Sequence, residues 1–213
     1  MRLAFIDSGL GLLPAFRHVI KKSLAHECFF FMCEEGPLGN KTDRELQKLA
    51  AKYVARFAQL KIDKAFVCCN TLSRFFPDSP DIYKVVTYNR KLLNGDSLVL
   101  ATVATCRSKE YPRALALPSL AAEIESGDIE AIINTVGTIG LTDKRVILGC
   151  THYPLIYRIF EDYYPNVEFL DGMKDMLKIL ETFKPDVRSY FANGKALPIL
   201  SHFCPDIVLL PLS

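Results

Sequence analysis

Two cysteines in this sequence stand in settings that suit acid/base chemistry. Cys69 is followed by an asparagine and a threonine, and Cys150 is followed by a threonine and His152. In both places a mostly apolar, strand-like run comes before the cysteine and polar residues come after it. Positive potential at a helix start favours a thiolate over a thiol. We therefore expect both cysteines to exchange protons with a ligand, and His152 is near enough in sequence to assist Cys150.

The other five cysteines lack this setting. Free cysteine is among the most buried residue types and often packs as a small apolar side chain. Neighbouring side chains on a strand point to opposite faces, so Cys68 should point away from Cys69 and into the core. The same interpretation applies to Cys28, Cys33, Cys106 and Cys204. A metal site shared by cysteines and His152 is disfavoured, because the spacing matches no common zinc pattern.

Residues 64–71 and 145–152 share one plan: a basic residue, apolar strand positions, a cysteine at the strand end, and polar residues that open a helix. Both cysteines should therefore lie at carboxyl ends of strands, where ligands bind in parallel α/β sheets. Apolar runs predict strands at 3–6, 28–32, 65–69, 84–87, 98–103 and 146–148. Helical spacing predicts helices at 42–60, 120–126, 129–139, 154–163 and 173–183. The alternation indicates an α/β fold whose two halves face each other across a cleft.

The expected hinge between these halves is Asn94-Gly95-Asp96, a turn sequence between two strand-like runs. We expect an N-terminal α/β domain over residues 1–93, completed by 172–213, and a second α/β domain over 94–171. After Lys184-Pro185 the chain is punctuated by proline and glycine, as at Asn193-Gly194. This pattern predicts a hairpin or a packed tail rather than a new domain.

Composition narrows the class of protein. The chain has 213 residues, half of them hydrophobic, and a formal net charge of only +2. Such a balance does not suggest a nucleic-acid partner, and we expect a small-molecule one. The first residues hold no apolar stretch long enough for a signal peptide or membrane span, so we expect a cytoplasmic protein without a membrane partner. Seven irregularly spaced cysteines then favour reduced thiols over a disulfide framework.

Three segments resemble the signature blocks of glutamate racemases and the wider aspartate/glutamate racemase superfamily, in the family's order. They are Phe-Ile-Asp-Ser-Gly-Leu-Gly at 5–11, Cys69-Asn70-Thr71, and Leu-Gly-Cys-Thr-His-Tyr-Pro-Leu at 148–155. Weaker similarity at 37–39, 102–111 and 118–127 extends the resemblance to about residue 172. It implies two pseudo-symmetric α/β domains with mainly parallel sheets, an interdomain active site, and racemisation without pyridoxal phosphate, another cofactor or a metal. The family commonly forms homodimers.

Inverting an α-carbon requires proton removal on one face and delivery on the other, so a site needs two acid/base groups on opposite sides. Cys69 and Cys150 would supply them. By resemblance Asp7 belongs to the site, either holding the substrate ammonium or helping the neighbouring thiol, although a helix cap is an alternative. The substrate-binding candidates are Ser8, Pro37, Gly39, Asn70, Thr71, Thr105, Thr151 and Glu125. Singly, the hydroxyl residues are more often caps, and Glu125 could lie on a solvated helix face.

The sequence departs from the family pattern at positions that could reshape the pocket. Leu12 stands where a glycine is usual, Leu38 replaces a tyrosine, and Tyr88-Asn89 replaces an acidic residue and a proline. The leading hypothesis is interconversion of L- and D-glutamate, which in bacteria feeds peptidoglycan synthesis. An aspartate or other amino-acid racemase of the same superfamily is an alternative. A homologue that binds a metabolite or protein partner without turnover is another.

Overall fold

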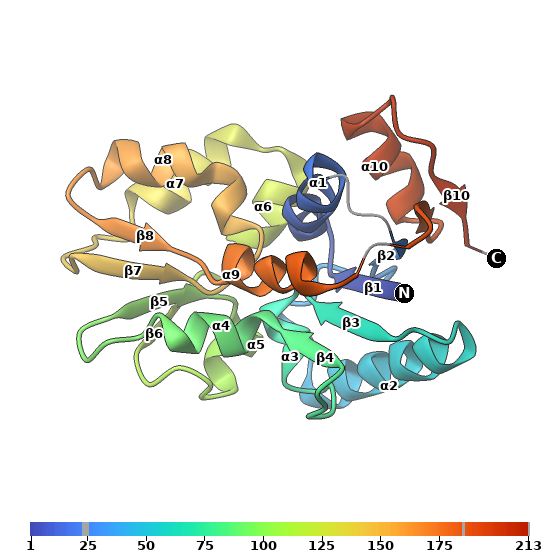
Figure 1. Ribbon diagram of the computed structural model, residues 1–213. Coiled ribbons are helices and arrows are strands. Elements are labelled where there is room, and N and C mark those ends of the chain that lie inside the picture. Colours follow the sequence, from blue (N-terminus) through green and yellow to red (C-terminus); the bar gives the residue numbers. More distant parts are fainter. Residues whose placement is uncertain (23–25, 185, 213) are drawn as a thin grey trace.

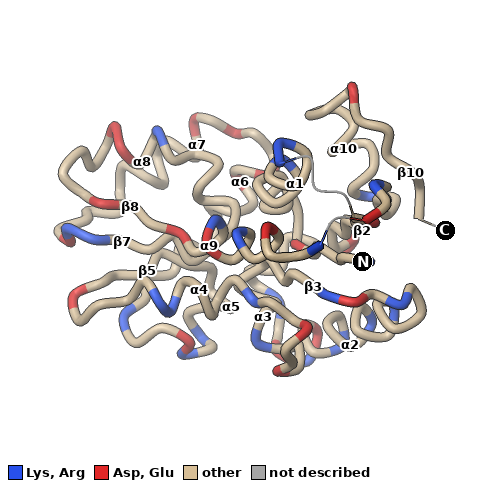
Figure 2. Tube along the Cα trace, viewed as in Figure 1, with Lys and Arg blue, Asp and Glu red and all other residues tan. Residues whose placement is uncertain are grey.

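The computed structural model describes residues 1–22, 26–184 and 186–212, so Pro185 and Ser213 of the predicted tail lie outside the described residues. The described chain forms a six-stranded and a four-stranded sheet, and all strand pairs in both are parallel (Figure 1). This architecture confirms the predicted α/β fold with parallel sheets. Basic and acidic residues are interspersed around both sheets (Figure 2). Within the described ranges no helix is long and apolar enough to cross a membrane.

The six-stranded sheet has the order β10-β9-β2-β1-β3-β4. Its strands are β1 (Arg2–Asp7), β2 (Glu27–Met32), β3 (Lys64–Val67), β4 (Ile82–Lys84), β9 (Ser189–Ala192) and β10 (Leu210–Pro211). The central strand β1 is almost wholly buried, as expected for a parallel strand covered on both faces. The Phe5 ring stacks between Phe30 and Phe66, with centroid distances of 5.1 and 5.0 Å. These stacked rings form the middle of one core layer.

Helices cover both faces of this sheet. On one side pack α1 (Leu13–Lys21), α9 (Met173–Leu177) and α10 (Ala196–Phe203), joined by the short 3-10 helices η1 (Leu10–Leu12) and η3 (Lys178–Thr182). On the other lies α2 (Asp43–Gln59), next to α3 (Asn70–Ser73). Helix α2 starts where predicted because Thr42 and Glu45 form a capping box that satisfies two backbone N–H groups.

The four-stranded sheet has the order β6-β5-β7-β8. Its strands are β5 (Leu98–Ala101), β6 (Ala114–Ala116), β7 (Arg145–Leu148) and β8 (Glu168–Leu170). Its helices are α5 (Val103–Arg107), α6 (Leu120–Ser126), α7 (Ile129–Gly137), η2 (Tyr153–Ile156) and α8 (Tyr157–Tyr163). The chain enters this sheet after α4 (Val85–Lys91) and leaves it between β8 and α9. The carboxyl ends of β1, β3, β5 and β7 therefore bring polar residues of both sheets together.

The predicted strand at 84–87 is wrong. Strand β4 ends at Lys84, and α4 begins at Val85. Both Val85 and Val86 are buried in the helix, and a short apolar run cannot by itself distinguish a buried helix from a strand. The predicted strand at 98–103 is also too long, because Thr102 caps α5 with its hydroxyl.

The C-terminal segment is a packed tail, and the alternative prediction of a hairpin is wrong. Strand β9 pairs with β2, and β10 runs parallel to β9 after the crossover helix α10. Parallel neighbours need such a crossover, whereas a hairpin joins antiparallel strands. Asn193 accepts a hydrogen bond from the Ala196 backbone N–H across the turn at 194–195 and fixes the start of α10.

Candidate active site

A small cavity lies between the carboxyl ends of strands from the two sheets. Its walls are formed by Ser8, Pro37, Leu38, Gly39, Cys69, Asn70, Thr71, Thr102, Ala121, Cys150, Thr151 and His152. Its volume is about 10 Å³, which is room for about one water molecule. Both cysteines of the echoed segments therefore face one closed site. A substrate must open it to enter.

Asp7 is hydrogen-bonded to two residues of the cavity wall and so joins the two halves. One carboxylate oxygen accepts hydrogen bonds from the backbone N–H and hydroxyl of Ser8, at 2.6 and 3.2 Å. The other accepts from the Thr151 hydroxyl at 2.9 Å, across from the second sheet. Burial raises the pKa of the Asp7 carboxyl, although the charge on His152 and these hydrogen bonds oppose the shift. Asp7 is fully buried and does not line the cavity.

Cys69 follows β3 and is held as a thiol. Its Sγ donates to the Ser8 hydroxyl at 3.7 Å. Burial raises the pKa of this thiol well above its usual range, and the nearby Asp7 carboxylate raises it further. The positive potential expected at a helix start therefore does not lower the pKa of Cys69 in the closed structure. Helix α3 has only four residues, and its weak positive end does not offset desolvation.

Cys150 has a different neighbourhood at the end of β7. Its Sγ lies 3.7 Å from Nδ1 of His152, and Nε2 of that ring lies 2.5 Å from the Glu125 carboxylate. Burial alone would lower the pKa of His152, but hydrogen bonds to Cys150 and Glu125 raise it to about 10. The imidazole is thus protonated at neutral pH. A positive charge beside a sulfur stabilises its anionic form.

Glu125 can reach His152 because the residue packed against its carboxylate is Gly9, which has no side chain. Its carboxylate also accepts the Leu10 backbone N–H at 2.5 Å. A methyl group added at Gly9 would overlap this carboxylate. Burial acts to raise the pKa of Glu125, yet the hydrogen bond and charge of His152 lower it. Glu125 therefore lies behind the histidine, outside the cavity wall, rather than on a solvated helix face.

A triangle of threonine hydroxyls forms another wall. The hydroxyl of Thr71 lies 2.9 Å from that of Thr102 and 3.0 Å from that of Thr105, and the last two are also 3.0 Å apart. Thr105 stands behind the wall, and Thr102, which the sequence interpretation did not select, lines it. Such hydroxyls can turn their hydrogens toward a carboxylate. The signal at Thr102 was its capping position immediately after a strand.

Asn70 completes this side of the cavity. Its side-chain oxygen accepts hydrogen bonds from Tyr111 and Asn89, at 2.8 and 2.9 Å. Its Nδ2 group is buried and has no hydrogen-bond partner among the described residues. A buried donor of this kind costs free energy unless a ligand or water accepts from it. Asn70 is therefore ready to donate to a bound anion.

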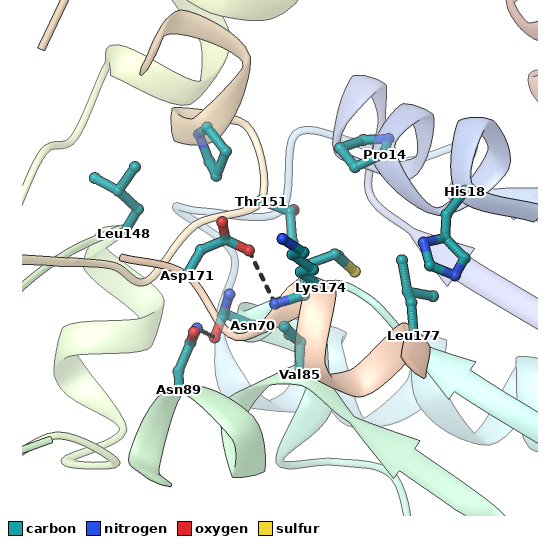
Figure 3. Close-up of a pocket in the computed structure, with 12 residues that line it drawn as sticks. Pro14, His18, Asn70, Val85, Asn89, Leu148, Thr151, Asp171, Lys174 and Leu177 are labelled. Atoms are coloured by element: carbon teal, nitrogen blue, oxygen red, sulfur yellow. Dashed lines mark hydrogen bonds between the residues drawn. The ribbon is translucent and has the colours of Figure 1, made fainter. Parts of the chain in front are cut away.

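A second cavity of about 280 Å³ lies beside α9 and shares Asn70 and Thr151 with the first. Figure 3 shows His18, Asp171 and Lys174 among its walls, and we name it the α9 cavity. Sequence reasoning did not find it, because most of its lining comes from core positions on separate elements. Among the described residues no group of three or more His, Cys, Asp or Glu side chains could hold a metal ion.

No protein-family model matches the sequence. The glutamate racemase of Listeria monocytogenes serotype 4a is 30% identical over 193 residues, which cover 76% of this chain and 72% of that protein. The glutamate racemase of a Synechococcus strain is 25% identical over 199 residues, covering 79% and 74%.

Solved structures share the fold over nearly the whole chain. The glutamate racemase of Francisella tularensis in complex with D-glutamate matches with a TM-score of 0.82 at 20% identity, covering 100% of this chain and 96% of that one. The Escherichia coli glutamate racemase in complex with L-glutamate and an activator matches with a TM-score of 0.72 at 18% identity, covering 99% and 97%. Given the Listeria relative's identity and coverage together with this shared fold, the chain belongs to the glutamate racemase family and is an isomerase.

Proposed function

We propose that this chain interconverts the L and D enantiomers of glutamate, with Cys69 and Cys150 acting on opposite faces of the α-carbon. One observation carries the proposal: both cysteines line the same closed cavity, and they come from the ends of strands in different sheets. Inversion needs two acid/base groups so arranged. Neither group alone can both remove and replace the proton on opposite faces.

The proposed proton transfer balances within the site. The thiolate of one cysteine removes the α-proton and becomes a thiol, while the C–H electron pair stays on the α-carbon. The thiol of the other cysteine then delivers its proton to the opposite face and becomes a thiolate. In the reverse direction the two cysteines exchange roles, so each turnover leaves the site ready for the other enantiomer.

The neighbours of each sulfur support these roles. His152, protonated at neutral pH, lies beside Cys150 and stabilises negative charge there. Asp7 does not line the cavity, so of its two predicted roles we propose the second, assistance to Cys69 through Ser8. Asn70 and the hydroxyls of Thr71 and Thr102 would hold a substrate carboxylate. The other predicted substrate-binding residues remain part of the proposed site. Ser8, Pro37, Gly39 and Thr151 line the cavity, whereas Thr105 and Glu125 would support residues that line it.

Entry of the substrate would separate the two sheets. We propose that the chain divides into units 1–93 with 172–213, and 94–171, and that these units part around the cavity. In a bacterial cell the product D-glutamate would serve peptidoglycan synthesis, and the enzyme would work in the cytoplasm, as the family resemblance implies. The resemblance also implies a homodimer, which sedimentation of the purified chain would test.

A shorter substrate, aspartate, is the second candidate, and Leu38 is the wall residue that bears on it. This side chain is buried and lines the cavity where the family usually has tyrosine. Leucine is smaller than tyrosine and has no hydroxyl, so it changes both the space and the hydrogen-bonding groups that the wall offers to the far end of the substrate. Leu12, the other departure considered, is buried in the core beside α1 and does not line the cavity. Leu38 is therefore the position that would decide between the two substrates.

Both candidates can be tested in D₂O with purified protein. L-glutamate, and separately L-aspartate, is incubated with the chain while optical rotation and the α-proton NMR signal are followed. We expect glutamate to lose its optical rotation and to exchange its α-proton for deuterium. Turnover of aspartate alone would select the shorter substrate. No exchange with either amino acid, and no change in cysteine alkylation rate on adding them, would contradict the proposed racemase.

A further inference from the structure

A row of buried amides runs from the crossing between the sheets to the candidate active site. The backbone N–H of Gly172, where the chain returns toward α9, donates to Oδ1 of Asn89 at 2.6 Å. Nδ2 of Asn89 donates to Oδ1 of Asn70 at 2.9 Å. Figure 3 shows the two asparagines facing each other beside the α9 cavity. Asn89 is 1% exposed and Asn70 is 4% exposed, so water does not replace these bonds.

The backbone N–H of Gly172 determines which group donates and which accepts in each of these hydrogen bonds. A backbone N–H can only donate, so Asn89 must turn its oxygen toward Gly172. The NH₂ group of Asn89 then faces Asn70, so Asn70 must accept this hydrogen bond with its side-chain oxygen. The NH₂ group of Asn70 is left over, and it is the buried donor without a partner among the described residues. Tyr111 also donates to Asn70, but a hydroxyl can donate or accept and so imposes no direction.

We propose that Asn89 is a positioning residue that sets the orientation of the Asn70 amide, so that an N–H donor meets the substrate carboxylate. This inference rests on the proposed function. Asn89 does not line the site cavity and acts through Asn70. If Asn70 turned over, its oxygen would face the carboxylate, and two acceptors would repel each other. Through these hydrogen bonds, the backbone N–H of Gly172 would determine that Asn70 presents its NH₂ group to the substrate.

The close approach at Gly172 supports the same assignment. A Cβ atom at this position would lie 2.6 Å from the backbone nitrogen of Asn89, so the glycine lets its N–H reach the Asn89 side chain. Position 89 is also one where the sequence departs from the family pattern. The device therefore belongs to this chain's own residues and to the contact between α4 and the segment before α9.

Three variants test the proposal on L-glutamate, or on L-aspartate if that is the substrate. In Asn89→Asp, both carboxylate oxygens only accept, so Asn70 must turn its NH₂ group toward position 89. We expect KM to rise about ten- to a hundred-fold, the range for a lost hydrogen bond to a charged group. Lowering the pH should restore KM, because the introduced carboxyl group can donate again once it is protonated. Asn89→Ala removes the constraint without reversing it and should raise KM about three- to tenfold.

Tyr111→Phe is the control, because it removes the hydroxyl contacts to Asn70 and Asn89 but leaves the direction that the Gly172 N–H imposes on Asn89. We expect its KM within about threefold of the wild type. Thermal unfolding shows which variants fold, and if Asn89→Asp does not, Asn89→Ala and Tyr111→Phe decide. With active wild-type protein, an unchanged KM in Asn89→Ala, or a larger rise in Tyr111→Phe, would overturn the inference. An inactive wild type would instead remove the proposed function and this inference together.

Discussion

The two cysteines of the site sit in matching backbone positions but in opposite electrostatic surroundings. Cys69 has a hydroxyl and the buried carboxylate of Asp7 for neighbours, and its thiol pKa is raised. Cys150 has the imidazolium of His152 for a neighbour, backed by Glu125. The shared pattern of residues 64–71 and 145–152 thus determines where the two sulfurs lie, but not which of them carries charge. In the closed structure the first sheet supplies a thiol, and the second places the protonated imidazole of His152 beside its sulfur.

This asymmetry limits what kinetics can reveal. Enantiomers have equal free energies in water, so a racemase must have equal kcat/KM in its two directions. Unequal surroundings of Cys69 and Cys150 can therefore appear only in the separate kcat and KM values, in pH dependence, and in exchange without inversion.

The largest effect is expected from replacing either sulfur. Cys69→Ser and Cys150→Ser should each lower the racemisation rate by about 10²- to 10⁴-fold, the usual contribution of a positioned acid/base group. Each variant keeps one working face, so α-proton exchange in D₂O should survive for one enantiomer only, and for opposite enantiomers in the two variants. Cys106→Ser is the control and should remain active. A double variant that still racemises would contradict the mechanism.

Breaking the contact between His152 and Glu125, next to Cys150, should change the pH profile of kcat/KM. In Glu125→Gln, His152 loses a charged partner, so its pKa falls from about 10 toward the ordinary value. The alkaline limb of the kcat/KM profile should then move to lower pH. At a fixed pH above the limb, kcat/KM should fall about tenfold for each pH unit that the limb moves. Glu123→Gln is the control, because Glu123 lies on the same helix and bonds to Thr135 instead. Equal profiles for both variants would separate Glu125 from the site.

A steric change should produce the same signature without touching a titrating group. Gly9 has extended backbone, which any residue adopts, but a methyl there would displace the Glu125 carboxylate. We expect Gly9→Ala to lose activity about tenfold, as for one hydrogen bond to a charged group, and to shift the same alkaline limb. Gly95→Ala, whose Cβ would meet nothing within 4 Å, should change neither. A Gly9→Ala profile identical to the wild type would show that Glu125 does not act through this contact.

Stability should follow the sign of the His152 shift. Its pKa is about 10 in the folded chain and about 6.5 in the unfolded chain. Because the folded value is higher, the stabilisation is complete below about pH 6.5 and is lost as the pH rises toward 10. Urea unfolding between pH 6 and 10 should show a steeper decline for the wild type than for His152→Gln. Parallel declines would mean that the imidazolium does not stabilise the fold.

The sequence indicated much of this arrangement because strand ends in parallel sheets are positions that local patterns can locate. Residues 64–71 and 145–152 placed both cysteines at carboxyl ends of strands, which meet at one cavity, and Thr42 with Glu45 marked the start of α2. These features depend on a few adjacent residues. The α/β class follows from the same local alternation of apolar runs and helical periods.

What the sequence did not indicate depends on residues far apart in the chain. The raised pKa of Cys69 comes from packing around β3 and from Asp7, which no local pattern reports. The bond between Gly172 and Asn89 spans 83 positions. The start of α4 at Val85 was missed because tertiary packing, rather than periodicity, decides a short apolar run. Charge state and polar direction are thus set only after the two sheets meet.

The smallest effect on activity is expected at Cys68, the residue that precedes Cys69 in the chain. Cys68 is fully buried, but it belongs to the core cluster that contains Phe5, on the opposite face of the sheet from Cys69. Cys68→Ala should lower the free energy of unfolding by about 1 kcal/mol, as for a small buried group, while kcat/KM stays within about threefold. Urea unfolding and the optical-rotation assay measure the two quantities. If folded Cys68→Ala lost racemisation as completely as Cys69→Ser, the comparison would fail, because the chemistry would no longer depend on which face of β3 the sulfur occupies.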